Sequence, residues 1–393
     1  DIPGAIMSAN PIRDLFQLDP TVTFLNQGSF GATPKAVMAV YQEWQNVLEQ
    51  QPVAYFRAID ERLATARAAL GNFLNTDGDN LVYVPNATFG VNIVGQGMGL
   101  KAGDEILTTN HEYGACLNVF RFLEGKIGIK VVEAPVSLPA IDEEEYVEQI
   151  WAHRSDKTKL LFISHVTSAT ALRLPIEQLC ARAREEGILS LVDGAHVIGQ
   201  WPLDMTEVGA DFYTSNAHKW LCSPKGSAFL YAAPQHHDML DPLVVGWGWG
   251  PDRKKHFGSD FLDFHQYLGT NDFAAYLSVP AAIDFHHEHN WPAVRARCHE
   301  MVSDWVETMA DFTGLDPVYG DDAFYSQMAV APLPEGTDTI QLKADLYDHF
   351  RVEIPCVVWN DRPFIRISLQ GYNTQDDVDR LMEGLASLLK RPG

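Results

Sequence analysis

Between residues 81 and 219, short apolar runs alternate with longer segments that have the periodicity of helices. The runs are residues 81–84, 105–109, 130–134, 159–164 and 189–192. Strands separated by helices form βαβ units, in which neighbouring strands run parallel and are buried on both faces. The alternation therefore predicts an α/β protein built on a large, mainly parallel sheet.

Two segments of this sheet turn polar where their strands should end. Asp193 follows the run 189–192, and Lys219 follows a further apolar stretch that begins at residue 211. The carboxyl ends of parallel strands share one rim, where ligands bind. A desolvated lysine can form a Schiff base (aldimine) with an aldehyde cofactor, and a carboxylate can keep a pyridine nitrogen protonated. Either segment alone is more ordinarily a turn or a cap, but together they predict pyridoxal 5'-phosphate (PLP).

Other polar residues are expected at the same rim. Ala87 and Thr88 follow a strand and open a helix, whose N–H groups and dipole suit a phosphate. Tyr113 could stack on a pyridine ring, and Ser168 and His196 could donate to a ring hydroxyl. Each also has a local alternative as a cap, a core tyrosine or a turn residue.

Arg366 interrupts the apolar run 363–369. A buried arginine needs a partner, for which a carboxylate is the natural choice. The partner is either a substrate carboxylate or an acidic residue of the chain. Arg362 is the weaker candidate for the same role.

Beyond Lys219 the pattern changes. A further strand is expected at 227–231, and residues 242–272 contain no clear helix, which in so long a loop usually signals function. Strands at 326–332 and 363–369, with helices at 339–350 and 375–390, predict a smaller α+β unit. We expect a segment 1–20 that packs on the small domain, a large PLP-binding domain 21–274, and a small C-terminal domain 275–393.

Composition excludes several classes of partner. The net charge of −23 argues against nucleic acid and against an anionic membrane surface. Five scattered cysteines without metal-ligand spacing predict reduced thiols, a cytoplasmic setting and no metal site. No apolar run approaches the ~20 residues that span a bilayer, and no secretory signal is visible.

As a set, these residues resemble the class V aminotransferase and cysteine desulfurase group, which are PLP enzymes of the aspartate aminotransferase fold. The resemblance covers roughly residues 20–390. It rests on residues 193–196, on residues 216–219 and on Arg366 with Tyr372 and Asn373. Within the group the chain is most similar to the isopenicillin N epimerases, through residues 25–31, 104–114, 162–166, 244–249 and 353–355.

The resemblance implies a role for each candidate residue. Lys219 would carry the cofactor and act as base, Asp193 would pair with the pyridine nitrogen, and Tyr113 would stack on the ring. The phosphate would be held by Ala87, Thr88, Asn216 and His218, and from a second subunit by Gly269 and Thr270, which implies a homodimer. Ser168 and His196 would lie near the ring hydroxyl. The substrate would be bound by Arg366, with Asn26, Tyr55 and Trp247 as further candidates.

The reaction implied is carbanion chemistry at Cα of an amino acid or amino-acid-containing substrate, with epimerisation as the first choice. Alternatives are a C–S lyase or cysteine desulfurase, an aminotransferase and, least favoured, a non-catalytic PLP-binding module. Tyr113 or a bound water is the guess for a second acid. Desulfurases use a loop cysteine upstream of the equivalent arginine, but Cys356 lies only ten residues before Arg366. We therefore expect Cys356 to be a buried, inert thiol.

Overall fold

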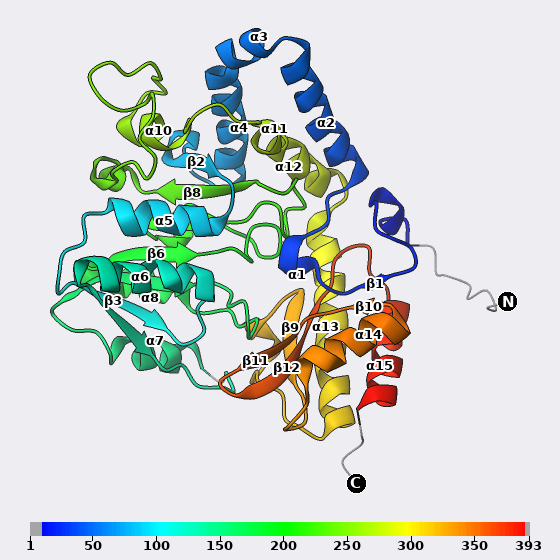
Figure 1. Cartoon of the computed structure of the whole chain (residues 1–393). Helices are drawn as coiled ribbons and strands as arrows, with labels where there is room; N and C mark the ends of the chain where they lie inside the picture. Colours follow the sequence, from blue (N-terminus) through cyan, green and yellow to red (C-terminus); the bar gives the residue numbers. More distant parts are fainter. Residues whose placement is uncertain (1–9, 141, 390–393) are drawn as a thin grey trace.

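The computed structural model describes residues 10–140 and 142–389. Its centre is a seven-stranded sheet with the order β2-β8-β7-β6-β5-β3-β4 (Figure 1). The strands, in chain order, are β2 (Leu81–Val84), β3 (Glu105–Thr109), β4 (Lys130–Ala134), β5 (Thr158–Ser164), β6 (Leu189–Asp193), β7 (Phe212–Ser215) and β8 (Ala228–Ala232). Strands β3 to β7 pair in parallel with their neighbours, whereas β8 runs antiparallel to both β2 and β7. The predicted mainly parallel sheet is confirmed.

Successive side chains of each strand enter two different hydrophobic cores. In β2, for example, Leu81 and Tyr83 face one core, and Val82 and Val84 face the other. The first core is closed by α4 (Ile59–Phe73), α7 (Glu143–Trp151), α8 (Ile176–Glu185) and α9 (Met205–Val208). The second is closed by α5 (Ala87–Gly97), α6 (Gly114–Ile127) and α10 (Asp260–His265). Burial on both faces explains why the strands read as continuous apolar runs.

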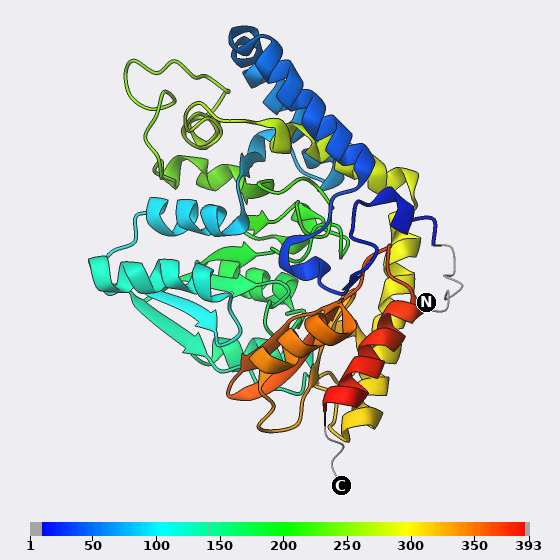
Figure 2. The ribbon, with the colours of Figure 1, turned by 45° about the vertical axis from the view of Figure 1, so that its right-hand side comes forward.

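The C-terminal part is built on a three-stranded antiparallel sheet with the order β11-β12-β9. Its strands are β9 (Met328–Pro332), β11 (Cys356–Trp359) and β12 (Arg362–Ser368). The accompanying helices are α13 (Trp291–Thr313), α14 (Thr339–Phe350) and α15 (Gln375–Leu388), of which α13 packs on β9 and α14 on α15. Figure 2 shows the orange and red strands and helices gathered below the main sheet, with the yellow helix α13 beside them. Helices α11 (Ala274–Leu277) and α12 (Val279–Glu288) instead pack on α2 (Lys35–Gln50) and α4.

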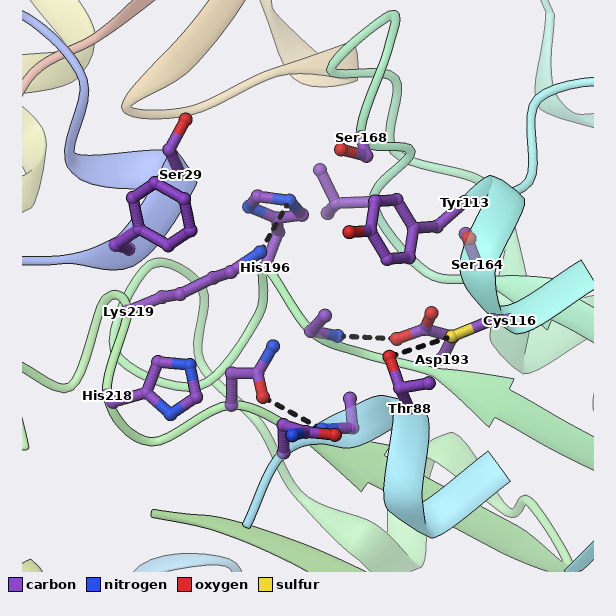
Figure 3. Close-up of a pocket in the computed structure, with 16 residues that line it drawn as sticks. Ser29, Thr88, Tyr113, Cys116, Ser164, Ser168, Asp193, His196, His218 and Lys219 are labelled. Carbon is purple, nitrogen blue, oxygen red and sulfur yellow. Dashed lines mark hydrogen bonds between the residues drawn. The ribbon is translucent and has the colours of Figure 1, made fainter. Parts of the chain in front are cut away.

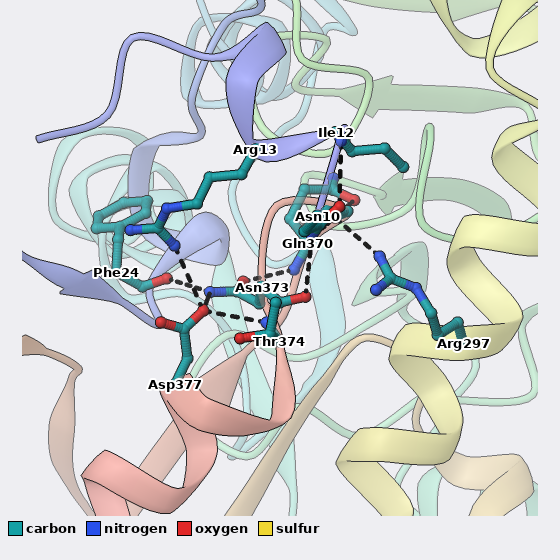
Figure 4. Close-up of polar contacts among 10 residues, drawn as sticks. Asn10, Ile12, Arg13, Phe24, Arg297, Gln370, Asn373, Thr374 and Asp377 are labelled. Atoms are coloured by element: carbon teal, nitrogen blue, oxygen red, sulfur yellow. Dashed lines mark hydrogen bonds and ion pairs between the residues drawn. The ribbon is translucent and has the colours of Figure 1, made fainter. Parts of the chain in front are cut away.

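The N-terminal stretch of the described chain runs along the C-terminal part. Strand β1 (Thr23–Phe24) pairs in parallel with β10 (Val352–Glu353). Asn10 donates to the carbonyl of Gly371 at 2.9 Å, and Arg13 forms an ion pair with Asp377 at 3.5 Å (Figure 4). Residues 1–9 of the segment expected to pack on the small domain lie outside the described residues. After β1 the chain enters α1 (Gln27–Phe30), then α2 and α3 (Pro52–Arg57).

The prediction that residues 242–272 contain no helix is wrong, because α10 lies at Asp260–His265. Its N-cap is Ser259, whose side chain accepts from the N–H of Leu262 at 3.2 Å. A helix of six residues is too short for its apolar periodicity to show. Strand β11 was also not predicted, since its residues are half-exposed at the edge of the small sheet. None of the helices that the structure describes is long and apolar enough to cross a membrane.

Candidate functional site

A cavity of about 250 Å³ lies at the carboxyl ends of the parallel strands (Figure 3). The loops that follow β2, β3, β5, β6 and β7 all contribute to it. It is lined by Ser29, Phe30, Asn86, Ala87, Thr88, Tyr113, Cys116, Ser164, Val166, Ser168, Asp193, Ala195, His196, Asn216, His218 and Lys219. The structure thus brings together nine of the residues predicted at the rim: Ala87, Thr88, Tyr113, Ser168, Asp193, His196, Asn216, His218 and Lys219.

Lys219 lies in the turn after β7, and its amine points into the cavity towards His196. The Lys219 Nζ to His196 Nε2 distance is 3.3 Å. The pKa of Lys219 is lowered to about 8, chiefly by burial and also by the charge of Arg366, while Asp193 opposes the shift. A lysine with such a pKa is a nucleophile near neutral pH.

Asp193 is the last residue of β6 and is buried beneath the cavity. Its Oδ1 accepts from the N–H of Ala195 at 3.0 Å. Burial raises the pKa of Asp193, against the lowering effects of that hydrogen bond, of the Cys116 thiol and of Lys219. The carboxylate therefore lacks a full counter-charge within the chain, and a protonated ring nitrogen would supply one.

Helix α5 begins at the edge of the cavity. The side chain of Asn86 caps it by accepting from the N–H of Phe89 at 2.9 Å, and Ala87 donates its N–H to Asn216 Oδ1 at 2.9 Å. The helix can approach β7 closely because residue 90 is glycine; a Cβ there would lie 2.4 Å from Thr214 Oγ1. The approach places the positive end of the α5 dipole beside Asn216, in the geometry that binds a phosphate.

Arg366, on β12, is buried against the main domain. It donates to the carbonyl of Ser168 at 2.5 Å and to Ser29 Oγ at 3.3 Å. Burial lowers the pKa of Arg366 to about 10. Within residues 10–140 and 142–389 no carboxylate pairs with this guanidinium, so the structural ion pair that was the alternative reading is not formed there.

Glu112 is a partly buried carboxyl that sequence reasoning did not single out. Its Oε2 accepts from the N–H and the hydroxyl of Ser164 at 2.8 and 2.5 Å, and its Oε1 accepts from Thr109 Oγ1 at 2.7 Å. The pKa of Glu112 is raised to about 7, chiefly by burial and also by the charge of Asp193, although the hydrogen bonds from Ser164 and Thr109 oppose the rise. Because the Ser164 hydroxyl donates its proton to Glu112, the lone pairs of the Ser164 oxygen remain free to accept a hydrogen bond from a group in the cavity.

Six of the candidate residues do not line this cavity, namely Arg366, which contacts the lining residues Ser29 and Ser168, and five others. Asn26 donates to Glu353 and accepts from Ser29, Tyr55 is buried in α3, and Trp247 is exposed on the loop before α10. Gly269 and Thr270 line a second cavity, of about 230 Å³, with Tyr83, Phe89 and His265. Their roles remain predictions.

Sequence reasoning missed several lining residues: Ser29, Phe30, Cys116, Ser164, Val166 and Ala195. Ser164 ends β5 as Asp193 ends β6, so its position at a strand end was the available signal. Cys116 lies one turn into α6 and contacts Thr88 Oγ1 at 3.7 Å. Ser29 and Phe30 reach the cavity through the path of the N-terminal segment, which no local pattern reveals.

The comparison with protein families decides the class. The family model described as aminotransferase class-V matches residues 30–381. The chain belongs to the class V aminotransferase family. It is 35% identical over 391 residues to the isopenicillin N epimerase of Amycolatopsis lactamdurans, covering 96% of this chain and 98% of that protein. It is 29% identical over 428 residues to putative L-cysteine desulfhydrase 1 of Oryza sativa subsp. japonica, covering 98% of this chain and 87% of that protein.

Solved structures agree on the fold. A cystine C–S lyase, C-DES, in complex with cysteine persulfide has a TM-score of 0.83 at 22% identity, covering 95% of this chain and 99% of that one. The cysteine desulfurase of Thermococcus onnurineus has a TM-score of 0.82 at 20% identity, covering 96% and 97%. The predicted PLP-dependent transferase fold is therefore confirmed.

This class V enzyme depends on PLP, and the cavity fits that cofactor. It holds an amine of lowered pKa for the aldehyde, a buried carboxylate for the pyridine nitrogen and a helix N-terminus for the phosphate. Tyr113, 49% exposed at the start of α6, extends over the cavity between these groups (Figure 3). The buried guanidinium of Arg366 contacts Ser168 and Ser29, which line the cavity, and no carboxylate of the described residues pairs with it.

Proposed function

We propose that this enzyme epimerises an amino acid or an amino-acid-containing substrate at Cα. The observation that carries the proposal is the similarity to isopenicillin N epimerases along nearly the whole chain, at 35% and 32% identity. The cavity supports it, because an amine of lowered pKa lies on its wall. The guanidinium of Arg366, which has no acidic partner among the described residues, contacts the lining residues Ser168 and Ser29.

In this reaction each residue of the site would have a separate role. Bound PLP supplies an electron sink that acidifies the Cα–H bond. Arg366 would bind the substrate carboxylate, and Asp193 would keep the ring nitrogen protonated. Lys219 would accept the Cα proton on Nζ. A donor on the opposite face, for which the Tyr113 hydroxyl or a water molecule is the candidate, would return a proton to Cα with inverted configuration.

The test is proton exchange at Cα. The purified holoenzyme is incubated in D₂O with isopenicillin N and with a panel of L-amino acids, and products are analysed by chiral chromatography and mass spectrometry. We expect one deuterium at Cα and the appearance of the opposite configuration. Exchange without inversion, or no exchange with any member of the panel, would contradict epimerisation.

The second candidate is C–S cleavage, which the similarity to cysteine desulfhydrases favours. The same carbanion would then expel sulfur from the β-carbon instead of being reprotonated. Release of sulfide and pyruvate from cysteine would identify a desulfhydrase. Transfer of the amino group to an added oxo acid would identify an aminotransferase, and a cofactor spectrum that no amino acid changes would indicate a binding module.

Replacing Cys356 by alanine should leave the turnover rate within about twofold of the wild type. Cys356 begins β11, where it lies opposite Ile365 of β12, and it does not line the cavity. The prediction that it is buried is wrong, because it lies on an edge strand and is only partly buried. Burial raises the pKa of Cys356 to about 12, so its thiol is protonated and a poor nucleophile at neutral pH. Sulfide and alanine production from cysteine are measured in parallel. Alanine release that disappears in Cys356→Ala would establish a desulfurase instead.

Replacing Arg366 by lysine should lower kcat/KM about 10²-fold, mainly through KM. An ammonium keeps the charge but loses the planar fork that binds a carboxylate through two hydrogen bonds. Steady-state kinetics on the substrate found above give the two constants. The matched control is Arg362→Lys on the same strand, where the side chain is exposed and lies over Phe364. An unchanged KM in Arg366→Lys would remove Arg366 from the substrate site.

We propose a homodimer with a site near each subunit interface. Large apolar side chains are exposed around the cavity mouth and on the loop before α10, among them Phe30 at 74% and Trp247 at 59%. Gly269 and Thr270, which the family resemblance places at the phosphate, lie outside this chain's own cavity, as they would if they served a partner. Light scattering should give twice the chain mass, and a monomer would contradict the proposal.

The five free cysteines support a reducing, cytoplasmic setting.

A further inference from the structure

Behind the catalytic amine, three side chains form a hydrogen-bonded row. The indole Nε1 of Trp220 donates to His196 Nδ1 at 3.3 Å. On the other side of the imidazole, Nε2 lies 3.3 Å from the Nζ of Lys219. Trp220 and His196 are both buried, and Figure 3 shows the imidazole facing the lysine amine. Trp220 follows Lys219 directly in the chain, so one turn presents both residues to the same imidazole.

The donors and acceptors of this row have a single consistent assignment. An indole N–H can donate but cannot accept, so Nδ1 of His196 must be the unprotonated nitrogen. Burial lowers the pKa of His196 well below its ordinary value, which excludes the doubly protonated ring. The one proton of the neutral imidazole therefore lies on Nε2, facing Lys219. An N–H can donate only to a lone pair, and the amine of Lys219 has a lone pair only when it is neutral.

We propose that Trp220 is a positioning residue: it fixes His196 in the tautomer protonated on Nε2, so that His196 donates to Lys219 and favours the unprotonated amine. A protonated Lys219 would need an acceptor at Nε2, which the indole contact at Nδ1 prevents. The hydrogen bond from His196 therefore favours the neutral amine of Lys219, as burial also does. It keeps the amine ready to attack the aldehyde of PLP.

The surroundings hold the row in place and bias it in the same direction. Gly199 lies against the backbone of Trp220, where a Cβ would come within 2.5 Å of the Trp220 carbonyl oxygen, and Gln200 donates to the carbonyl of His196 at 2.6 Å. The charged and titratable groups that face the row are Arg366, Asp193 and Cys116. The charge of Arg366 disfavours a proton on both His196 and Lys219, whereas Asp193 and Cys116 favour one on Lys219.

The experiment compares Trp220→Phe with the wild type. Phenylalanine keeps an aromatic ring in the site and removes the N–H. The matched control is Trp305→Phe in α13, because Trp305 is equally buried and its Nε1 has no hydrogen-bond partner among the described residues. The full chain is stripped of PLP, and its histidines are labelled with ¹⁵N. The His196 signals are assigned by their loss in a His196→Gln variant.

Two measured quantities, the tautomer of His196 and the pH midpoint of PLP capture, are expected to change together in Trp220→Phe. In the wild type and in Trp305→Phe, the ¹⁵N shifts should show His196 protonated on Nε2. In Trp220→Phe a large fraction should be protonated on Nδ1. Added PLP then serves as the probe of Lys219: the pH midpoint of its rate of capture should rise by about half a unit to one unit in Trp220→Phe alone.

A wild-type His196 protonated on Nδ1 would overturn the proposal without any variant, so the test survives even if Trp220→Phe does not fold. An unchanged tautomer and an unchanged midpoint in a folded Trp220→Phe would overturn it as well. Neither readout requires knowledge of the substrate. The result is therefore independent of whether the enzyme epimerises, cleaves or transaminates.

Discussion

Lys219→Ala should lower turnover by on the order of 10³-fold or more. In the proposed mechanism two functions would disappear with one side chain, because the same Nζ would hold the aldehyde and then move the Cα proton. The cofactor should still enter the cavity, since Asp193, the start of α5 and Tyr113 remain. It should, however, be lost on gel filtration, whereas in the wild type it stays attached. The measurements are the rate of deuterium incorporation at Cα and the amount of PLP retained.

The control for this variant is Lys225→Ala. Lys225 lies on the same loop, is exposed and contacts Thr33 Oγ1 at 3.3 Å, so its loss should leave turnover and PLP retention unchanged. Retained activity in Lys219→Ala would move the covalent attachment to another lysine and remove the basis of the proposed mechanism.

The pH dependence of cofactor capture follows from the pKa of Lys219. Only the neutral amine attacks an aldehyde, and the pKa of about 8 means that this form is a minority below pH 8. In the wild-type protein without PLP, the capture rate should therefore rise with pH through a midpoint at about pH 8 before it levels off. The ordinary lysine pKa of 10.5 would place the plateau beyond the usual range of assay.

Asp193→Asn should lower turnover by on the order of 10³-fold while leaving the protein folded. A neutral amide cannot hold a proton on the pyridine nitrogen, so the ring loses most of its capacity to accept electrons from Cα. Proton exchange at Cα in D₂O measures the loss. Asp211→Asn is the control, since Asp211 is a buried carboxylate at the start of the neighbouring strand, bound to Ser190 and His236 and remote from the cavity.

The melting temperatures of Asp193→Asn and Asp211→Asn are expected to differ. Because burial raises the pKa of Asp193 above 3.8, the folded chain binds a proton that the unfolded chain has already released. Without PLP, the free energy of unfolding therefore falls as the pH rises from the pKa of Asp193 in the unfolded chain to its raised pKa in the folded chain. At neutral pH the ionised carboxylate destabilises the fold. We expect Asp193→Asn without PLP to melt no lower than the wild type at pH 7, whereas Asp211→Asn melts lower. A lower melting temperature for Asp193→Asn would mean that the carboxylate supports the fold.

The functional residues at the ends of the strands were predictable because their positions follow from the sequence immediately around them. A buried strand reads as an apolar run, and the polar residue that ends it must emerge at the rim, so Asp193 and Lys219 could be placed from the sequence alone. Ala87 and Thr88 were predicted for the same reason. Ser164 obeys the same rule and was missed because a serine carries less evident chemistry than a carboxylate or an amine.

What could not be predicted depends on contacts between distant segments. Arg366 was expected to have a carboxylate partner, but the sequence could not show that its chain partners are the carbonyl of Ser168 and the hydroxyl of Ser29. Trp220 reads as one more apolar residue until the position of His196 is known. The short helix α10 and the edge strand β11 gave no periodicity strong enough to be seen.

The parallel pairing of β1 with β10 has a consequence for how the chain becomes active during synthesis. Thr23 is aligned with Val352, and Ser29 reaches Arg366 through that alignment. While the ribosome is still making the last part of the chain, the large sheet can already fold, since its strands end at Ala232. The guanidinium that contacts Ser168 and Ser29 beside the cavity is missing until residue 366 has emerged. A nascent chain should therefore be able to capture vitamin B6 phosphate on Lys219 before it can hold a substrate carboxylate.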